Sequence, residues 1–291
     1  MKTVDLHTHS NKSDGSFSPT ELVDYAVAKG LSAVALTDHD TIDGLEEAVS
    51  HAEALRQAGK PSVEVVPGIE FSTKHEEQDV HVVGLYIAYD SPDFCTKLQE
   101  FVDSRTGRNI KMCRNLREAG IDITYEKLQE RNPDAVITRA HYATYLFDEG
   151  YVKSRSEAFA KYLGDHTKYF VPREKVTPEQ AVSLILEVGG IPILAHPPLY
   201  HMSKERLDRL VSILKDVGLM GIESLYSTYT NQDERDMMKL ADKYDLLLSG
   251  GSDFHGANKP NLDLGTGYGK LFVPEEYLTK IKKAVRAVEA D

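Results

Sequence analysis

The hydrophobic positions of this chain form short apolar runs that alternate with stretches of helical periodicity. Apolar runs of strand length occupy residues 3–6, 31–36, 63–66, 191–195, 219–222 and 246–249. Helical patterns lie between them, for example at about 19–29 and 45–58, and the first begins with the capping box Ser18-Pro19-Thr20-Glu21. Alternation of this kind predicts an α/β fold with a parallel sheet.

Two segments depart from this alternation. Residues 71–74 and 80–87 have strand character, and the charged turn between them is too short for a crossover helix, so they predict an antiparallel hairpin. In a hairpin the second strand starts beside the end of the first, so His81 can lie on the same side of the sheet as Glu70. Helical patterns then occupy about 94–119, 124–131, 138–149 and 156–163, and the last predicted helix covers about 274–290.

Residues with metal-binding side chains follow most of the predicted strands. His7 and His9 stand at alternate positions, so both imidazoles point to one face of an extended backbone. In a β/α barrel the strand ends form a single face, where residues distant in sequence meet. About seven strands favour such a barrel, and the first strand lacks the glycine-rich turn of a dinucleotide-binding fold. The candidate ligands are His7, His9, Asp14, His39, Glu70, His81, His196, Asp253 and His255.

The number and type of these ligands indicate several catalytic ions. Six imidazoles and three carboxylates exceed what one ion can use. Mixed nitrogen and oxygen ligands suit catalytic zinc, manganese or iron, whereas structural zinc is usually closed by four ligands that include cysteine. Two or three ions about 4 Å apart can hold a hydroxide and neutralise the attacking and leaving oxygens of a phosphoryl group. Glu223 also follows a strand, and its role stays open between orienting a ligand and stabilising local structure.

Composition narrows the classes of partner. The formal net charge of -12 argues against a protein that coats long nucleic acid, because such binding depends on Lys and Arg neutralising phosphates. No apolar run approaches the ~20 residues that span a bilayer, and the first residues lack the order of a signal peptide. We therefore expect a cytoplasmic protein without membrane contact, and no pattern implies an obligate protein partner.

Short motifs along the chain resemble those of the polymerase and histidinol phosphatase (PHP) family of metal-dependent phosphoesterases. In order they are DLHTHS with SDG, TDHD, GIE, HVVG, AHP, a second GIE and GSDFHG, spanning Asp5 to Gly256. The resemblance implies a distorted seven-stranded β/α barrel, 1–91 and 171–291, with a helical substrate-capping domain inserted at 92–170. It also implies two or three divalent metal ions, manganese first and iron or zinc as alternatives.

The family pattern assigns the candidate ligands to three sites. The first ion would be held by His7, His9, Glu70 and Asp253. Glu70 would bridge to a second ion, whose other ligands are His81 and His196. A third ion would be held by Asp14, His39 and His255. These three are also the candidate catalytic residues, and either one of them or a water bound to the metal would protonate the leaving oxygen.

Within the family, the insertion and the string SRTGRN at 104–109 look most like the branch that hydrolyses nucleoside 3′,5′-bisphosphates. In that branch an R-x-x-R pair and an Arg in a T-R-x-H string bind substrate phosphate, and the matching residues here are Arg105, Arg108 and Arg139. Arg105 and Arg108 share a face of a predicted helix, and guanidinium groups match phosphate oxygens. His141 is a further candidate for phosphate contact.

The resemblance thus implies an enzyme that removes the 3′-phosphate of substrates such as adenosine 3′,5′-bisphosphate by in-line attack of a metal-held hydroxide. A 5′-to-3′ exonuclease on short oligonucleotides would use the same chemistry. Histidinol-phosphate phosphatase belongs to the same family, but its cationic substrate with one phosphate would not explain three arginines. An inactive metal-binding regulatory module would lack ligands, and none is missing. The tyrosines of the insertion, such as Tyr142, Tyr145 and Tyr151, fit a core better than base stacking.

Overall fold

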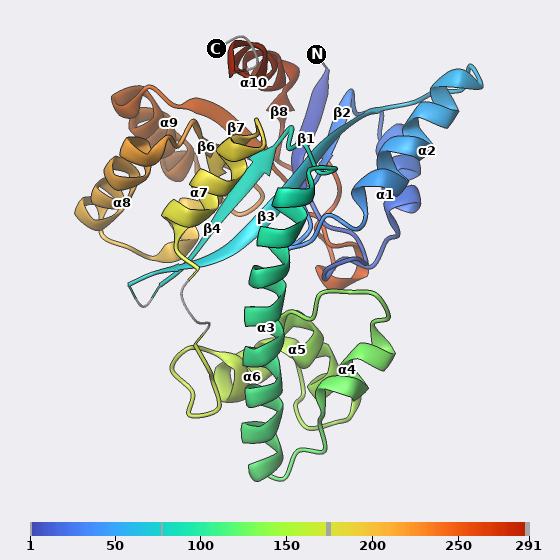
Figure 1. Cartoon of the computed structure of the whole chain (residues 1–291), viewed down its shortest axis with the longest axis vertical. Coiled ribbons are helices and arrows are strands. Elements are labelled where there is room, and N and C mark those ends of the chain that lie inside the picture. Colours follow the sequence, from blue (N-terminus) through green and yellow to red (C-terminus); the bar gives the residue numbers. More distant parts are fainter. Residues whose placement is uncertain (1, 77, 173–175, 289–291) are drawn as a thin grey trace.

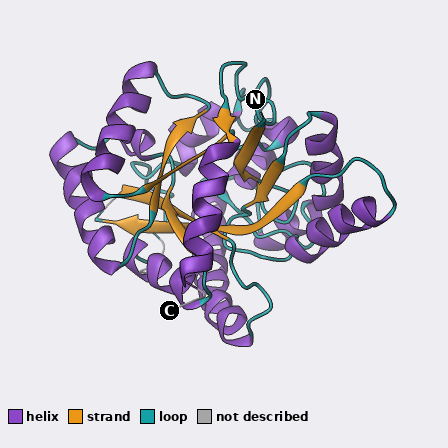
Figure 2. Cartoon of the chain, turned by 90° about the horizontal axis from the view of Figure 1, so that it is seen from above, coloured by secondary structure: helices purple, strands orange, loops and turns teal. Residues whose placement is uncertain are grey.

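The computed structural model describes residues 2–76, 78–172 and 176–288. It shows an α/β barrel surrounded by helices, with a second group of helices at one end (Figures 1 and 2). The strands are β1 (Thr3–Thr8), β2 (Ala33–Leu36), β3 (Glu64–His75), β4 (Gln78–Leu85), β5 (Ile191–Leu194), β6 (Gly221–Tyr226), β7 (Leu247–Gly251) and β8 (Val273–Pro274). The α-helices are α1 (Pro19–Ala28), α2 (Leu45–Gln57), α3 (Pro92–Glu118), α4 (Tyr125–Arg131), α5 (Arg139–Asp148), α6 (Arg155–Ala158), α7 (Pro178–Glu187), α8 (Lys204–Val217), α9 (Asn231–Tyr244) and α10 (Glu275–Val288). A π-helix, η1 (Phe159–Leu163), and two 3-10 turns, η2 (Pro197–Tyr200) and η3 (Gly256–Asn258), complete the set.

The strands form one sheet that nearly closes into a barrel. Their order is β7-β6-β5-β4-β3-β2-β1-β8, with β4 antiparallel to both β3 and β5. The chain after β7 reaches β1, because the Asp253 N–H donates to the His7 carbonyl at 2.8 Å and the His9 N–H to the Phe254 carbonyl at 2.9 Å. Gly251 permits this approach, since a Cβ there would lie 2.4 Å from the Cβ of His7. Closure therefore brings the ends of β1 and β7 together.

The predicted α/β barrel is confirmed, with two differences in its strands. The sequence predicts separate strands at 63–66 and 71–74, but β3 runs unbroken through both. Residues 64–67 pair with β2 and residues 68–75 with β4. Pro67, which has no N–H to donate, thus stands where β3 changes partner. The eighth strand, β8, has only two residues and pairs antiparallel with β1, so it leaves no apolar run to recognise.

Side-chain caps fix where several helices begin. The Ser18 side chain accepts from the Glu21 N–H, and Glu21 accepts from the Ser18 N–H, which closes the predicted capping box of α1. Thr177 and Gln180 do the same for α7. The predicted helix at 156–163 differs, because one turn of α6 continues as the π-helix η1. Helix α10 ends at Val288, and the predicted extension to 290 lies outside the described residues.

The apolar side chains of the helical insertion form a core of their own. Met112, Leu116 and Tyr142 belong to this buried cluster, whereas Phe94 and Leu98, near the start of α3, pack into the main core of the barrel. Helix α3 therefore belongs to both parts, and Figure 1 shows it leading from the barrel into the insertion. The division into a barrel, 1–91 and 171–291, and an inserted domain, 92–170, stays a prediction.

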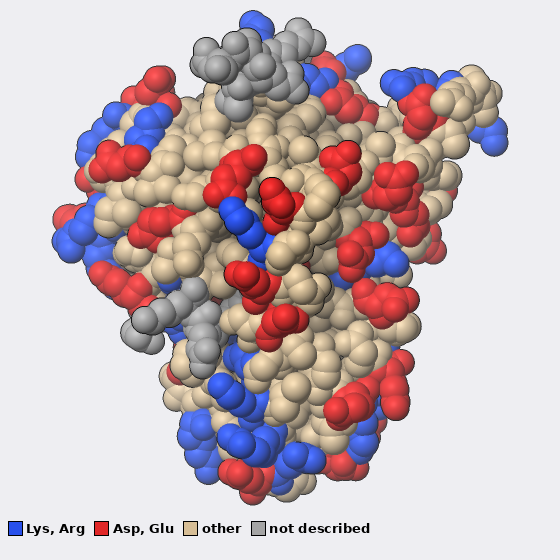
Figure 3. Space-filling view, in the orientation of Figure 1, with Lys and Arg blue, Asp and Glu red and all other residues tan. Residues whose placement is uncertain are grey.

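Charged side chains are distributed unevenly over the surface. On the face shown in Figure 3, Asp and Glu are spread over the barrel, and a group of Lys and Arg side chains gathers over the insertion at the bottom.

Among the helices that the structure describes, none combines the length and the apolar character needed to cross a membrane.

Candidate metal centre and substrate cavity

The strand ends that face the insertion carry the predicted ligands. His7 lies in β1 and His9 directly follows it, while Glu70 lies within β3 and His81 within β4. The remaining ligands follow strands β1, β2, β5 and β7. They are Asp14, His39, His196, Asp253 and His255. The structure brings all nine residues into one cluster, which is largely buried.

Glu70 stands at the centre of this cluster and is fully buried. Its Oε2 lies 3.2, 3.2 and 3.1 Å from ring nitrogens of three histidines, and its Oε1 lies 2.8 and 3.0 Å from ring nitrogens of two others. The first three rings are those of His7, His9 and His39, and the other two are those of His81 and His196. A carboxylate in this position would help to hold two divalent ions, whose charge it would offset.

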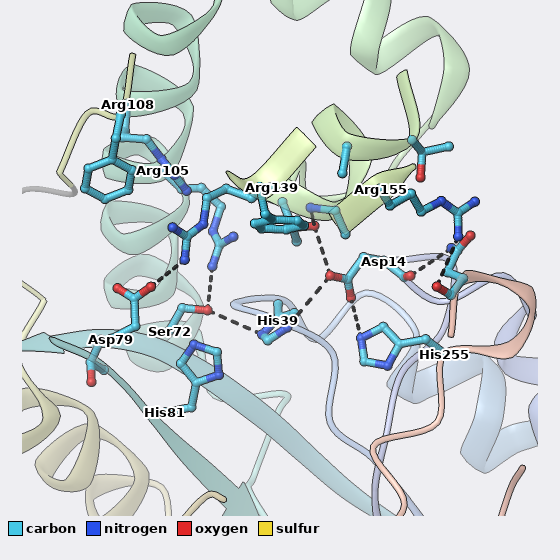
Figure 4. A pocket seen from close by; sticks show the side chains of 18 of the residues that line it. Asp14, His39, Ser72, Asp79, His81, Arg105, Arg108, Arg139, Arg155 and His255 are labelled. Carbon is cyan, nitrogen blue, oxygen red and sulfur yellow. Dashed lines mark hydrogen bonds and ion pairs between the residues drawn. The ribbon is translucent and has the colours of Figure 1, made fainter. Parts of the chain in front are cut away.

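Asp14 forms a second centre with His39 and His255 (Figure 4). Its Oδ1 lies 3.1 Å from Nε2 of His255, and its Oδ2 lies 3.9 Å from Nε2 of His39. Thr138, from the insertion, donates its hydroxyl to Oδ2 at 2.9 Å. Gly15 lets the chain turn tightly here, because a Cβ would lie 2.4 Å from the backbone oxygen of His9.

Asp253 joins the two centres. Its Oδ1 lies 3.2 Å from Nε2 of His9 and 3.3 Å from Nδ1 of His255. Its Oδ2 accepts from the Tyr226 hydroxyl and from the Lys259 ammonium, both at 2.5 Å. The backbone of Asp253 has a φ of 57°, in the left-handed region that non-glycine residues rarely adopt. Strain of this kind persists at functional sites where the surrounding structure holds it.

The hydrogen bonds of His7 and His255 indicate that the cluster is suited to cations. Nδ1 of His255 lies 2.8 Å from the carbonyl oxygen of Asp253, and Nδ1 of His7 lies 2.8 Å from Glu223 Oε1. Because these oxygens only accept, we assign a proton to Nδ1 in both rings. In the neutral rings, Nε2 then points a lone pair at a carboxylate oxygen of Asp14 or Glu70, so a positive charge is needed between them. Divalent cations meet this need.

The buried atoms without hydrogen-bond partners support the same conclusion. Among the described residues they include Nε2 of His7, Nε2 of His9, Oδ1 of Asp14 and Oε2 of Glu70. The candidate ligands form four sets, and within each set the ligand atoms lie within 4.8 Å of one another. These sets are His9, Asp14, His39 and His255; His7, Glu70 and His196; His7, His9 and Asp253; and His39, Glu70 and His81. The donor set therefore fits divalent metal ions, and His9 falls in two of the sets.

The pKa values of the three carboxylates and of two histidines, His39 and His255, favour the forms that bind metals. Burial would raise the pKa of Glu70, but the neighbouring His7 and His39 hold it well below its usual value. Burial lowers the pKa of His39 to about 3 and also lowers the pKa of His255. Burial is outweighed at His9, where the neighbouring carboxylates of Asp253 and Glu70 raise the pKa to about 9, and at His7, where Glu223 and Glu70 raise it. Ionised carboxylates and neutral imidazoles are metal ligands, so an ion at His9 would displace a proton.

Glu223 orients two of the predicted ligands. Its Oε1 accepts from Nδ1 of His7 at 2.8 Å, and its Oε2 accepts from the backbone N–H of His196 at 2.7 Å. The second bond helps to hold His196 at a φ of 33°. These contacts answer the question that the sequence leaves open, because Glu223 fixes the ring of His7 and the position of His196.

Substituting Glu223→Gln is expected to weaken metal binding by about 10–100-fold, the usual effect of removing a carboxylate that orients a ligating histidine. Metal affinity would be measured by titration of the metal-free protein with manganese and with zinc. Glu100→Gln, an exposed carboxylate in α3, is the matched control. Equal affinities of the two variants would contradict an orienting role.

A cavity of about 350 Å³ leads from this cluster to the insertion. Its wall includes Asp14, His39, His81 and His255 from the cluster. Six cationic side chains also line it. They are Lys74, Arg105, Arg108, Arg139, Arg155 and Lys259. The volume lies within the range of small-molecule sites, and the cations suit an anionic ligand.

Two of the predicted arginines are held by carboxylates. Arg105 donates Nε–H to Asp40 at 2.8 Å and an Nη2–H to the Ser72 hydroxyl at 2.7 Å. Asp40 therefore links the barrel to α3. Arg139 forms ion pairs with Asp79 and Asp165. Both guanidinium groups still line the cavity.

The other two predicted substrate residues differ in position. Arg108 lines the cavity beside Arg105, one helical turn further along α3. His141 does not belong to the cavity wall. Its Nδ1 accepts from the Thr138 backbone N–H at 3.0 Å and closes a capping box at the start of α5. Phosphate contact by His141 stays a prediction.

Several cavity residues are absent from the sequence-based set. Ser72 and Lys74 could have been found, because they follow Glu70 at alternate positions of one strand and so face the same side. Phe170 lies beneath two cations, with its ring centre 4.8 Å from the Lys74 ammonium and 5.4 Å from the Arg139 guanidinium. Three further residues, Arg155, Phe159 and Lys259, have no local signal that marks them.

Comparison with known proteins identifies the family of this chain. A family profile described as the PHP domain matches residues 5–187. A 5′-3′ exoribonuclease from Haemophilus influenzae is 37% identical over 254 residues, which are 87% of this chain and 90% of that protein. A 3′,5′-nucleoside bisphosphate phosphatase from Chromobacterium violaceum is 34% identical over 267 residues, 91% of each chain. A solved structure of an amidohydrolase from Chromobacterium violaceum, with bound sulfate and no metal, superposes with a TM-score of 0.83 at 31% identity, covering 97% of this chain and 96% of that chain.

The predicted family is thus confirmed by the profile, by relatives that match nearly the whole chain and by a closely superposing fold. The chain belongs to the PHP domain family, and it is a phosphoesterase of that family.

Proposed function

We propose that this phosphoesterase hydrolyses the 3′-phosphate of nucleoside 3′,5′-bisphosphates, giving the nucleoside 5′-phosphate and inorganic phosphate. The observation that carries the proposal is a single cavity that joins a cluster suited to cations with the side chains of Arg105, Arg108 and Arg139. In a substrate with two phosphates, one phosphate would lie at the cluster and the other would bind the arginines. The relative from Chromobacterium violaceum is named for this activity, and it matches 91% of the chain.

The residues have separable tasks in this reaction. We infer that the nine predicted ligands hold two or three divalent ions, with manganese as the first candidate. When bound, such ions supply Lewis-acid charge and a nucleophile from water. Arg105, Arg108 and Arg139 would bind the 5′-phosphate and so place the 3′-phosphate at the cluster, while the insertion closes the cavity over the substrate.

Cleavage at the 3′-phosphate forms a bond between phosphorus and the attacking oxygen and breaks the bond between phosphorus and O3′. The leaving O3′ takes up a proton. We assign this transfer to the group of Asp14, His39 and His255, which lines the cavity and would pass to O3′ the proton that the attacking water loses. The Thr138 hydroxyl, which donates to Asp14 Oδ2, would keep that carboxylate in place.

A second candidate is 5′-to-3′ exonuclease action on short oligonucleotides, favoured by the name of the relative from Haemophilus influenzae. The chemistry is closely related. In both substrates the first nucleotide carries a 5′-phosphate, and the bond broken lies between O3′ and the following phosphorus. The substrates differ only in whether that phosphorus bears another nucleotide.

The substrate preference is tested by comparing kcat/KM of the manganese-loaded protein on three compounds. We expect adenosine 3′,5′-bisphosphate to react at least about tenfold faster than histidinol phosphate, because the amine of the latter would face cationic side chains. A 5′-phosphorylated oligonucleotide measures the second candidate. Release of phosphate from histidinol phosphate but not from the bisphosphate would overturn the proposal.

A further inference from the structure

The cavity has cationic side chains on two sides of the metal-binding cluster. Arg105 lies toward Ser72, whereas Arg155 lies on the other side, beyond Asp14 (Figure 4). Arg155 donates an Nη1–H to the backbone oxygen of Asn258 at 3.1 Å, and Asn258 donates its side-chain amide to the backbone oxygen of Asp14 at 2.9 Å. These bonds hold Arg155 at the end of the cavity away from the predicted phosphate-binding arginines.

Arg155 differs from Arg105 and Arg139 in the carboxylates that lie near its guanidinium. The guanidinium of Arg105 is paired with Asp40, and that of Arg139 with Asp79 and Asp165. Within residues 2–76, 78–172 and 176–288, no carboxylate oxygen lies within 4.0 Å of the Arg155 guanidinium. Its hydrogen bond to the Asn258 carbonyl oxygen does not neutralise the guanidinium, so the positive charge can attract an anion in the cavity.

Phe159 stands four positions after Arg155 and lines the same cavity. It begins the π-helix η1, whose wide turn is closed by the Gly164 N–H donating to the Phe159 carbonyl at 2.9 Å. The neighbouring Ala158 and Leu163 are fully buried in the core of the insertion, whereas Phe159 is 37% exposed. Side chains four apart on a helix share a face, and π-helical turns occur often at functional sites.

The ring of Phe159 differs in its contacts from the other phenylalanine of the cavity, Phe170. Lys74 and Arg139 lie over the ring of Phe170. In the part of the chain that the structure describes, the Phe159 ring makes no contact with another aromatic ring or with a cation. A large apolar ring exposed in a cavity with cationic side chains is suited to stacking on a flat ligand group.

We propose that Arg155 and Phe159 form a second nucleotide subsite, which binds the nucleotide attached to the far side of the scissile phosphate. The inference rests on the proposed function, in which the first nucleotide lies toward Arg105, Arg108 and Arg139. A nucleoside bisphosphate has no group left for Arg155, whereas an oligonucleotide supplies a further phosphate and base. The guanidinium binds that phosphate, and the phenyl ring stacks on the base with little preference for its identity. The site therefore takes 5′-phosphorylated dinucleotides and short oligonucleotides.

The test compares Arg155→Ala and Phe159→Ala in the full, manganese-loaded chain. Arg114→Ala and Phe147→Ala are matched controls, because both residues are exposed on the insertion and neither lines the cavity. We expect kcat/KM for a 5′-phosphorylated trinucleotide to fall about tenfold further than kcat/KM for adenosine 3′,5′-bisphosphate in each cavity variant. Arg155→Lys should recover part of the loss.

Binding without turnover gives an independent readout. With no metal added, the cavity variants should weaken binding of 5′-phosphorylated diadenylate about tenfold more than binding of adenosine 5′-phosphate. Equal losses for both ligands, or for both substrates, would overturn the subsite and indicate that Arg155 only braces Asn258. A wild-type protein that cleaves the bisphosphate but no oligonucleotide would overturn the subsite and leave the proposed function standing. Failure to cleave either compound would overturn both.

Discussion

Replacing Glu70 with Gln is expected to lower kcat by about a thousandfold or more, because several kcal/mol of metal-derived charge stabilisation depend on this carboxylate. Glu70 contacts five imidazoles, with three ring nitrogens facing Oε2 and two facing Oε1. A neutral amide has the same shape but only one acceptor oxygen, so it cannot serve two ions. The variant should therefore also bind fewer equivalents of metal.

Glu64→Gln is the matched control for this measurement. Glu64 lies six positions earlier in the same strand, where it accepts from the Tyr86 hydroxyl and pairs with Lys282 away from the cluster. Metal content after dialysis, measured by atomic emission, and kcat on the best substrate should be close to wild type in this control. A Glu70→Gln protein that kept full metal content and turnover would show that the ions are bound elsewhere.

Replacing Arg105 with Met is expected to lower the free energy of unfolding by about 3–5 kcal/mol, the usual result of leaving a buried charge without its partner. The side chains of Arg105 and Asp40 are 5% and 0% exposed. The variant would leave the Asp40 carboxylate in the interior, where its remaining donors include the Ser72 N–H at 3.0 Å. Urea unfolding, followed by circular dichroism, measures the change.

The double variant Arg105→Met, Asp40→Leu separates the ion pair from the packing of the two side chains. Removing both charges should restore part of the lost stability, although turnover should stay low because Arg105 is a proposed phosphate ligand. Arg105→Lys, which keeps a charge but not the guanidinium fork, should lie between Met and wild type. Stability equal to wild type in the single Met variant would contradict a structural role for the pair.

Features that depend on local periodicity could be predicted from the sequence. His7 and His9 point to one face because a strand has a period of two, and the barrel topology then places the other strand ends beside them. The Ser18 and Thr177 caps are recognisable because their partners lie three residues away. The sequence predicts β3 as two strands, because Pro67 interrupts the strand pattern and only the structure shows that the pairing partner changes there.

Features that depend on how two elements meet could not be predicted in this way. The pair of Arg105 and Asp40 links residues 65 positions apart, and nothing near either residue specifies the other. Glu223 contacts His7 across 216 positions. Arg155 and Phe159 line the cavity only because the insertion is placed over the strand ends, and that placement follows from packing rather than from a motif.

Phosphorus NMR of adenosine 3′,5′-bisphosphate, incubated with the manganese-loaded protein, tests most directly whether this cavity directs hydrolysis to the 3′-phosphate. The 3′-phosphate signal should disappear as signals of adenosine 5′-phosphate and inorganic phosphate grow, and a chelator should stop the change. Accumulation of adenosine 3′-phosphate would contradict the proposed orientation of the substrate. An unchanged bisphosphate, in a sample that hydrolyses another phosphoester, would contradict the proposed substrate itself.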